Sequence, residues 1–461
     1  MDELTSGSDG AGDAPSLRTS SPTEGPAGSP RSRHWTEQQA EAHLRSLELF
    51  GMRFGLERMR RMMTALGSPQ RSFDAIHVVG TNGKSSTTRM IAAILERHGL
   101  RTGAYLSPHL ISYTERVQVG EHDLEPEAFA SAVARAAHAA EQVNRTLAED
   151  DHVTQFELLT AAALWELARR DVEVAVVEAG LGGRYDATSV IDSRVAVLTN
   201  VGLEHTRWLG PTLKDIAEEK LAVVQPESTL VLGQDLAAPA LAVAREVARE
   251  RSAQIVTAVP ERVRLLAKGG FQRRNFGLAR AAATAYLQGV GVPLDEGAVA
   301  DAAASLEVAG RLQLLPGDPP TLVDGAHNPD AIGALLESLG DCLPAGAPLG
   351  LVLGVLEDKD AAAMLAPLLE VCERAWFTAP PSSRALSPAA LQSLARQLGF
   401  EEATCEPDPA RALEQARLWA LERGASVLAT GSVYLVGDLL GRLRSSGTID
   451  ATQADSGRSG R

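Results

Sequence analysis

The sequence predicts an α/β fold, with a doubly wound first domain followed by a smaller Rossmann-like α/β domain. A short apolar run, Ala75–Val79, leads into the glycine-rich stretch Gly80–Thr87 and then into a helical pattern, which is the strand, loop and helix order of this fold class. The apolar run 174–177 shows no polar alternation, as expected for a strand covered on both faces. A second series of strands and helices follows Arg311.

The predicted elements of the first domain follow one another in chain order. A helical pattern begins at Thr36 and continues through Leu47 to Leu66. The helix after the glycine-rich stretch places its apolar residues on one face, namely Met90, Ile91, Ile94 and Leu95. The later strands are expected at Val172–Glu178, Arg194–Thr199 and Thr229–Leu232, with helices at Glu157–Arg169 and Leu213–Val224.

Four apolar runs separated by alanine-rich helical stretches predict the second domain. These runs are Thr321–Val323, Leu349–Leu353, Arg374–Thr378 and Val427–Ala429. We expect a hinge at Val308–Arg311, so that the domains cover residues 34–307 and 308–444 and close over a cleft. Sixteen of the first 33 residues are Ser, Gly or Pro, and the end of the chain is similar. We therefore predict disordered tails at 1–33 and 445–461.

Composition excludes several classes of protein. The 461 residues include 44 Lys and Arg against 59 Asp and Glu, a net charge of −15, which argues against a nucleic-acid partner. The three cysteines, Cys342, Cys372 and Cys405, are widely spaced, so a disulfide framework or zinc ribbon is excluded and a reducing compartment is expected. No apolar run is as long as a membrane span, and Met1–Arg33 lacks the apolar core of a secretory signal. We expect a cytoplasmic protein with no membrane partner.

The stretch Gly80-Thr-Asn-Gly-Lys-Ser-Ser86 is the strongest functional signal. Glycines let the backbone approach phosphate oxygens, Lys84 places a cation against the β- and γ-phosphates, and a hydroxyl can hold Mg²⁺. The stretch is shorter than the common GxxxxGK[ST] loop, since position 78 is Val. A glycine turn with a surface lysine is the alternative, but the strand before the stretch and the helix after it favour an ATP site.

Further motifs follow in a fixed order. They are LSPHL (106–110), TQFE (154–157), EAGLGGRYDAT (178–188), LEH (203–205), Lys220, DGAHNP (324–329), DKD (358–360) and GSVY (431–434). In this order and at these separations, from about Leu47 to Leu440, the chain resembles the folylpolyglutamate synthase/dihydrofolate synthase family of the Mur ligase superfamily. The resemblance implies a P-loop-containing N-terminal Mur-ligase-like domain and a smaller Rossmann-like C-terminal domain, and it favours a monomer.

The resemblance also implies an ATP-dependent ligase. Such an enzyme adds L-glutamate to 7,8-dihydropteroate, to tetrahydrofolate and its polyglutamates, or to both. The acid first takes the γ-phosphate of ATP to form an acyl phosphate, the amine of L-glutamate attacks it, and ADP and phosphate are released. The expected small-molecule partners are therefore dihydropteroate, folates, L-glutamate and ATP. Phosphoryl transfer between two anions needs cationic compensation, which divalent metal supplies.

Metal-binding residues are implied one by one by the same resemblance. Ser107, Glu178 and His205 match the family's metal ligands, and Lys220 matches a lysine that is carbamoylated and helps to hold a second Mg²⁺. Two Mg²⁺ ions are therefore expected, with Mn²⁺ as a substitute because a histidine ligand is unusual for Mg²⁺. Lys220 also falls on an apolar helix face, where an unpaired ammonium is costly, so it is either modified or reaches solvent.

The remaining site residues come from the same resemblance. Nucleotide contacts are expected from Thr81, Asn82, Gly83, Lys84, Ser85, Ser86, Asn275, Arg311 and Asp324. Lys84, Lys220 and His205 are expected to act in catalysis. Substrate contacts are expected from Thr154, Tyr185, Asp186 and Ala187, with Asp358 and Lys359 on the glutamate side. Arg184 would either meet a substrate carboxylate or neutralise Asp186.

Three other functions fit parts of the pattern. They are another amino-acid ligase of the Mur superfamily, a P-loop kinase for small molecules, and a nucleotide-binding switch without chemistry. The Phe156-Glu157 pair and the segment 178–184 argue against the first. Ser85 stands where the family commonly has Gly, which leaves open whether Ser85 or Ser86 faces the metal.

Overall fold

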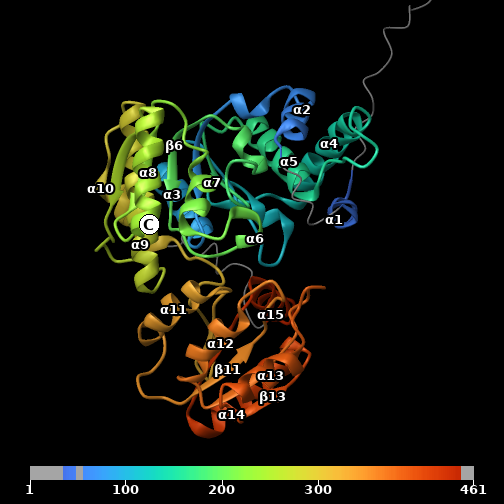
Figure 1. The fold of residues 1–461 in the computed structure, drawn as a ribbon, viewed down its shortest axis with the longest axis vertical. Coiled ribbons are helices and arrows are strands. Elements are labelled where there is room, and N and C mark those ends of the chain that lie inside the picture. The colour runs from blue at the N-terminus through green and yellow to red at the C-terminus, as the bar shows by residue number, and fades with distance from the viewer. Residues whose placement is uncertain (1–34, 48–54, 448–461) are drawn as a thin grey trace, which may run out of the picture. The chain divides into compact units, whose positions relative to one another are not determined.

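Two β-sheets with helices on both faces make up the part of the chain that the computed structural model describes, residues 35–47 and 55–447 (Figure 1). We call the first sheet and its helices, up to residue 307, the N-terminal lobe, and the second sheet and its helices, from residue 308, the C-terminal lobe. Both lobes belong to one compact unit. The α/β fold class predicted from the sequence is confirmed.

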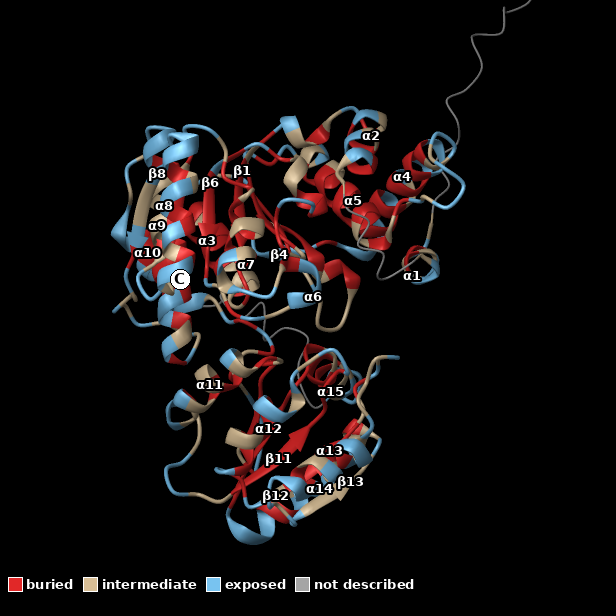
Figure 2. Ribbon diagram, in the orientation of Figure 1, coloured by how far each residue is buried: buried red, intermediate tan, exposed pale blue. Residues whose placement is uncertain are grey.

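The N-terminal lobe contains an eight-stranded sheet in the order β4-β3-β2-β5-β1-β6-β7-β8. Its strands are β1 (Asp74–Val79), β2 (Thr102–Tyr105), β3 (Val117–Val119), β4 (His122–Asp123), β5 (Val174–Glu178), β6 (Ser193–Leu198), β7 (Thr229–Gly233) and β8 (Gln254–Ala258). Strands β2, β5, β1, β6, β7 and β8 run parallel, whereas β3 and β4 are antiparallel at one edge. The central strands are buried, as Figure 2 shows, which agrees with their uninterrupted apolar sequence.

Helices cover both faces of this sheet. They are α1 (Glu37–Ser46), α2 (Glu57–Ala65), α3 (Lys84–Arg97), α4 (Pro126–Asn144), α5 (Gln155–Arg169), α6 (Thr206–Leu209), α7 (Leu213–Leu221), α8 (Ala238–Arg251), α9 (Gly270–Gly289) and α10 (Glu296–Ser305), with 3₁₀ turns at Pro69–Arg71, Tyr113–Arg116 and Ala187–Val190. Ile76 and Val78 of β1 pack with α3, α9 and α10, whereas Ala75 packs with α4 and α5 on the other face. Alternate residues of a strand point to opposite faces, so one apolar strand contributes side chains to the hydrophobic core on each face of the sheet.

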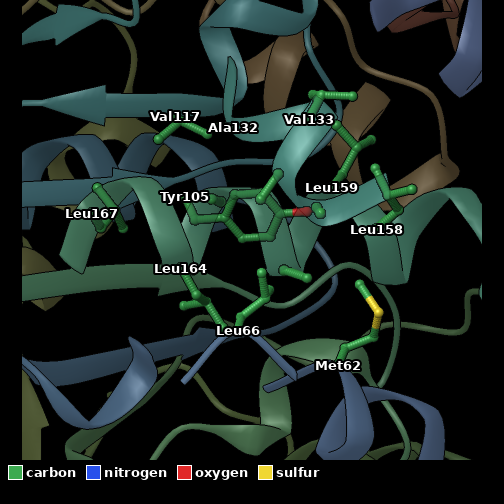
Figure 3. Packing of buried hydrophobic residues seen from close by; sticks show 14 of the residues in the cluster. Met62, Leu66, Tyr105, Val117, Ala132, Val133, Leu158, Leu159, Leu164 and Leu167 are labelled. Atoms are coloured by element: carbon green, nitrogen blue, oxygen red, sulfur yellow. The ribbon is translucent and has the colours of Figure 1, made fainter. Parts of the chain in front are cut away.

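Figure 3 shows the core between β2 and α5. The ring of Tyr105 lies among Leu66, Leu164 and Leu167, and its hydroxyl lies 3.1 Å from the hydroxyl of Thr160. The partner matters because an unpaired hydroxyl is costly in a core. This cluster anchors α5, whose first turn carries a predicted substrate residue.

The C-terminal lobe contains a six-stranded sheet in the order β13-β12-β11-β14-β10-β9. Its strands are β9 (Gln313–Leu315), β10 (Thr321–Val323), β11 (Leu349–Leu353), β12 (Arg374–Phe377), β13 (Ala403–Cys405) and β14 (Ser426–Thr430). Its helices are α11 (Pro329–Glu337), α12 (Ala361–Leu369), α13 (Pro388–Gln397), α14 (Pro409–Arg423) and α15 (Val433–Ser445), with a 3₁₀ turn at Leu339–Asp341. Strand β9 is antiparallel to β10 and the others are parallel. Helices α11 to α13 pack on one face, and α14 and α15 on the other.

Two sequence predictions about helix boundaries are wrong. The helix expected from Thr36 to Leu66 is interrupted, because Leu47 is extended (φ −85°, ψ 152°) and Gly55 has φ +126°, a conformation that a helix cannot contain. Helix α7 ends at Leu221 rather than Val224. Helix α15 includes Ser445, the first residue of the predicted C-terminal tail, and Ser446 caps it.

The other tail predictions, residues 1–33 and 448–461, lie outside the described residues. The domain boundary between 307 and 308 stays a prediction. Within the described ranges, no helix combines the length and the apolar character needed to cross a membrane.

Candidate active site

Polar residues gather at the carboxyl ends of four adjacent parallel strands, β2, β5, β1 and β6. The glycine-rich loop follows β1, Glu178 ends β5, Ser107 follows β2, and Thr199 and Asn200 follow β6. Parallel strands place their carboxyl ends at one edge of a sheet, which is where open α/β sheets bind ligands. Residues more than 100 positions apart are thereby brought side by side.

The glycine-rich loop is held in place by contacts within the protein. Gly83 has φ +80° and caps α3, and a Cβ at this position would collide with the side-chain oxygen of Asn275. The hydroxyl of Thr199 donates to the carbonyl of Asn82 (2.6 Å), and the amide of Asn82 donates to the side-chain oxygen of Asn200 (2.8 Å). The loop therefore presents the N-terminus of a 14-residue helix, a favourable place for phosphate.

Lys84 begins α3 and donates to the carbonyl of Thr81 at 3.1 Å, which folds its ammonium back over the loop. Asn275, from α9, donates to the side-chain oxygen of Gln272 at 3.0 Å. The side-chain nitrogen of Gln272 is buried and has no hydrogen-bond partner within the described part of the chain. The sequence did not single out Thr199, Asn200 or Gln272, because each acts through a contact with a distant segment.

Glu178 is buried, and its two carboxylate oxygens contact Ser85 and Ser107, two of the serines predicted to belong to the site. The hydroxyl of Ser85 donates to one oxygen at 3.0 Å, and the amide of Ser107 donates to the other at 3.0 Å. Burial raises the pKa of Glu178, while the nearby Lys84 ammonium opposes the shift. Ser86 is also buried, but it is Ser85 that contacts the carboxylate. The Ser85–Glu178 pair supplies hard oxygen donors beside a phosphate-binding loop, which fits a nucleotide-bound Mg²⁺.

Lys220 is buried on α7 and does not reach solvent. Its side chain donates to the carbonyl of Gly80 at 2.8 Å, directly behind the glycine-rich loop. Burial, together with the neighbouring Lys84, lowers the pKa of Lys220 to about 7. The alternative in which the side chain extends to solvent is therefore wrong.

His205 follows β6 and adopts φ +53°, the left-handed conformation that is unfavourable for a residue with a side chain. Burial lowers the pKa of His205 to about 4, although Glu204 opposes this shift. The imidazole is thus neutral near pH 7, as a metal ligand must be. No group of three His, Cys, Asp or Glu side chains clusters as a metal site among the described residues. Any metal here would need ligands from phosphate or water in addition to protein groups such as Ser85, Glu178 and a modified Lys220.

Loops of the C-terminal lobe contribute Arg311, Asp324 and Asn328. The carboxylate of Asp324 accepts hydrogen bonds from the amides of Leu312 and Ala326, at 2.9 and 2.8 Å. Arg311 lies close enough to Glu178 of the N-terminal lobe to help hold down the pKa of that carboxyl, against the effect of burial. The side chains of Asn82 and Asn328 exchange hydrogen bonds at 2.8 and 3.2 Å. Arg311 thus faces the site, whereas Asp324 orders the backbone at Leu312 and Ala326.

Glu204 connects the two lobes, and the sequence reasoning gave it no role. Its carboxylate lies 2.7 Å from the ammonium of Lys359 and 3.6 Å from Nε2 of His327. Burial opposes ionisation, but His327 and Lys359 lower the pKa of Glu204 to about 2. The motif LEH contains this residue, and its position beside His205 was the one signal that could have identified it.

The predicted substrate residues lie near the first turn of α5 and the loop after β5. Thr154 caps α5 and shares a capping box with Glu157, whose carboxylate also accepts from buried Arg58 at 3.0 Å. Asp186 is buried and accepts hydrogen bonds from the amides of Leu181 and Thr188. The loop therefore depends on Asp186 for its shape.

The neighbours of Asp186 differ in exposure. Tyr185 is exposed, with 45% of its surface accessible, while Ala187 is buried. Arg184 pairs with Glu219 at 2.8 Å, so the idea that it neutralises Asp186 is wrong. Phe156 packs against the core, and a side chain at Gly180 would strike its ring. Of this group, Arg184 and Tyr185 are the exposed residues.

Comparison with known proteins identifies the family. Residues 78–259 match the Mur ligase middle domain, and residues 310–433 match the Mur ligase glutamate ligase domain. The dihydrofolate synthase/folylpolyglutamate synthase of Escherichia coli is 32% identical over 359 residues, which cover 75% of this chain and 81% of that protein. The chain belongs to the dihydrofolate synthase/folylpolyglutamate synthase family.

Solved structures agree with this family assignment. The folylpolyglutamate synthase of Mycobacterium tuberculosis, complexed with ADP and AMPPCP, has a TM-score of 0.82 and 29% identity, covering 90% of this chain and 98% of that one. E. coli FolC in complex with DHPP and ADP has a TM-score of 0.78 and 28% identity, covering 91% and 100%. The Mur-ligase-like and Rossmann-like arrangement expected from the motifs is therefore confirmed.

One relative is about twice as long as the part of it that this chain matches. A probable bifunctional folylpolyglutamate synthase/dihydropteroate synthase of Haloferax volcanii is 33% identical over 428 residues, which cover 87% of this chain. The chain spans half the length of that protein.

Proposed function

We propose that this chain is an ATP-dependent ligase that adds L-glutamate to 7,8-dihydropteroate, to tetrahydrofolate and its polyglutamates, or to both. The observation that carries the proposal is the glycine-rich loop at the edge of the first sheet, with Lys84, Glu178 and Ser85 converging on it. Family membership narrows this nucleotide site to ligation, because the E. coli relative is named for both synthase activities.

The residues present account for the first half of the reaction. The loop amides and Lys84 would hold the phosphates of ATP and compensate the charge that develops as the γ-phosphoryl group moves to the carboxylate of the substrate. Arg311 would add a cation from the C-terminal lobe. The oxygen of the substrate acid attacks phosphorus, the bond to ADP breaks, and an acyl phosphate forms. The amine of L-glutamate then attacks the acyl carbon, and phosphate leaves.

We propose that Mg²⁺ accompanies the nucleotide and that Ser85, Glu178, Ser107 and His205 would hold it. When bound, Mg²⁺ neutralises phosphate charge. Lys220 would serve as a carbamate, formed when its neutral amine adds to carbon dioxide and a proton is released. Its burial, and a pKa lowered to about 7 by that burial and by Lys84, support this proposal because the amine must be uncharged to react. The carbamate would turn a buried cation into an anion suited to a second Mg²⁺, for which Mn²⁺ is a substitute.

Assays of phosphate release test the proposal. The protein is mixed with MgATP and dihydropteroate, with and without L-glutamate, and the same is done with tetrahydrofolate. A ligase releases ADP and phosphate only when both co-substrates are present. A kinase would work without glutamate and keep the phosphate on its product, and a switch would hydrolyse ATP slowly whatever is added. Either of these two results would refute the proposal.

A further inference from the structure

Glu204 lies at a junction of three loops. It follows β6 in the N-terminal lobe, whereas His327 follows β10 and Lys359 follows β11 in the C-terminal lobe. The carboxylate of Glu204 lies 2.7 Å from Nζ of Lys359, 3.6 Å from Nε2 of His327 and 4.0 Å from Nε2 of His205. One carboxylate therefore faces cationic or imidazole groups from both lobes.

The ion pair between Glu204 and Lys359 is shielded from water. The two side chains are 10% and 9% exposed. A buried pair costs desolvation, and leaving one member without the other is much more costly. The pair therefore forms only when both loops occupy these positions, and it resists their separation. Surface ion pairs in this chain have no such effect, because water replaces either partner.

Neutral contacts also join the two lobes. Asn82 and Asn328 exchange hydrogen bonds, and Leu110 and Ile111 of the N-terminal lobe pack against the core of α14 and α15. Apolar contacts of this kind tolerate small shifts. A charged hydrogen bond of 2.7 Å tolerates less, so Glu204 fixes the position of the Lys359 loop more tightly than the packing does.

We infer that Glu204 is a positioning residue for ligation: it holds the Lys359 and His327 loops of the C-terminal lobe against the nucleotide loop of the N-terminal lobe. This inference rests on the proposed function. Binding of ATP to the glycine-rich loop does not use Lys359, whereas transfer to the amine of L-glutamate needs groups from both lobes at once. Loss of Glu204 should therefore reduce turnover and leave nucleotide binding in place.

Glu204→Gln keeps the shape of the side chain and removes its charge. We expect kcat to fall by at least about tenfold, which is the effect of about 1.4 kcal/mol, while the Kd for MgATP changes by less than about threefold. Lys359→Met should lower kcat similarly. The double variant should be no worse than the more impaired single variant, because the two residues act as one unit. Glu204→Asp should recover part of the lost kcat.

Glu166→Gln is a matched control. Glu166 is a fully buried carboxylate that pairs with Arg169 and Arg170 at 2.6 and 2.9 Å, but all three residues belong to the end of α5. This variant should lower the melting temperature and leave kcat unchanged. If Glu204 had a purely structural role, Glu204→Gln would likewise lower the melting temperature and leave kcat unchanged. A normal kcat in Glu204→Gln, or additive losses in the double variant, would refute the positioning role.

Hydrogen exchange separates this inference from the proposed function. The amides of Lys359 and Ala361 should exchange faster in Glu204→Gln than in the wild-type protein, whichever reaction the enzyme catalyses. Unchanged exchange would overturn the positioning role. Failure of the wild-type protein to ligate glutamate, with faster exchange in the variant, would instead refute the proposed function alone.

Discussion

Lys84 and Lys220 lie beside the same loop but in different surroundings. Lys84 donates to the carbonyl of Thr81 at the start of α3, and Lys220 donates to the carbonyl of Gly80 from behind. Burial, together with the charge of Lys84, lowers the pKa of Lys220 to about 7. The first lysine can compensate phosphate charge, while the second needs a partner or a modification.

Lys84→Ala tests the phosphate role of the loop. We expect kcat to fall by at least about a hundredfold, because a positioned charge that stabilises the transition state contributes about that much. Steady-state phosphate release measures the loss. Circular dichroism and the melting temperature should remain close to those of the wild-type protein, since the substitution removes no core contact. Near-normal turnover would contradict the assignment.

Lys220→Ala tests the carbamate. Turnover should fall by at least about a hundredfold and should recover partly when short carboxylic acids are added, because they can occupy the space of the missing carbamate. Lys214→Ala, on the exposed face of the same helix, is the control and should behave like the wild-type protein. Mass spectrometry of the native protein that finds unmodified Lys220 in the presence of bicarbonate would argue against the carbamate.

At the scale of single elements, capping decides where the functional helices begin. Thr154 and Glu157 form a capping box on α5, and Thr212 and Asp215 form another on α7. The sequence predicts the second from its Thr-x-x-Asp pattern, and the structure confirms it. The sequence does not show that the carboxylate of Glu157 also accepts a hydrogen bond from Arg58 of α2, 99 residues earlier in the chain. The cap of α5 therefore ties the predicted substrate region to the early helix.

Thr154→Ala tests the cap and the substrate contact together. Loss of the capping hydroxyl should lower the free energy of unfolding by about 1 kcal/mol, as measured by urea denaturation. The KM for the pterin substrate should rise at the same time. Thr154→Ser keeps the hydroxyl and should restore both quantities. Equal stability of the Ala and Ser variants would contradict the capping role.

At the scale of the whole molecule, buried histidines make the fold sensitive to acid. His77 of β1 is buried and lies 2.8 Å from the hydroxyl of Thr188, and burial lowers its pKa from 6.5 to about 3. Burial likewise lowers the pKa of His109 to about 3 and that of His327 to about 4. Between the unfolded and folded pKa values the unfolded chain binds more protons, so the free energy of unfolding falls as the pH falls below 6.5.

His77→Gln tests this acid sensitivity. At a pH about one unit below the unfolded pKa, His77 alone should account for a loss of about 1 kcal/mol, because each pKa unit corresponds to about 1.4 kcal/mol. Urea denaturation at neutral pH and at the lower pH measures the change. The variant should lose less stability on acidification than the wild-type protein. An identical loss in both proteins would show that His77 is already protonated in the folded state.

The order of motifs was enough to predict the α/β fold, the ATP loop and the ligase family, because each depends on short local patterns that keep their spacing. Local pattern also placed Lys220 on an apolar face. The predicted metal, nucleotide and substrate contacts stay predictions, although Ser85, Glu178 and Ser107 lie together as those predictions require.

Tertiary structure alone decided which distant residues meet. Thr199 and Asn200 brace the loop after β1, Arg184 turns to Glu219, and Glu204 reaches Lys359 across 155 positions of the chain. None of these pairings has a sequence signature, because the partners are brought together by the order of strands in the sheet and by the approach of the two lobes. The sequence shows where the charged residues stand in the chain, but the fold determines which of them form ion pairs.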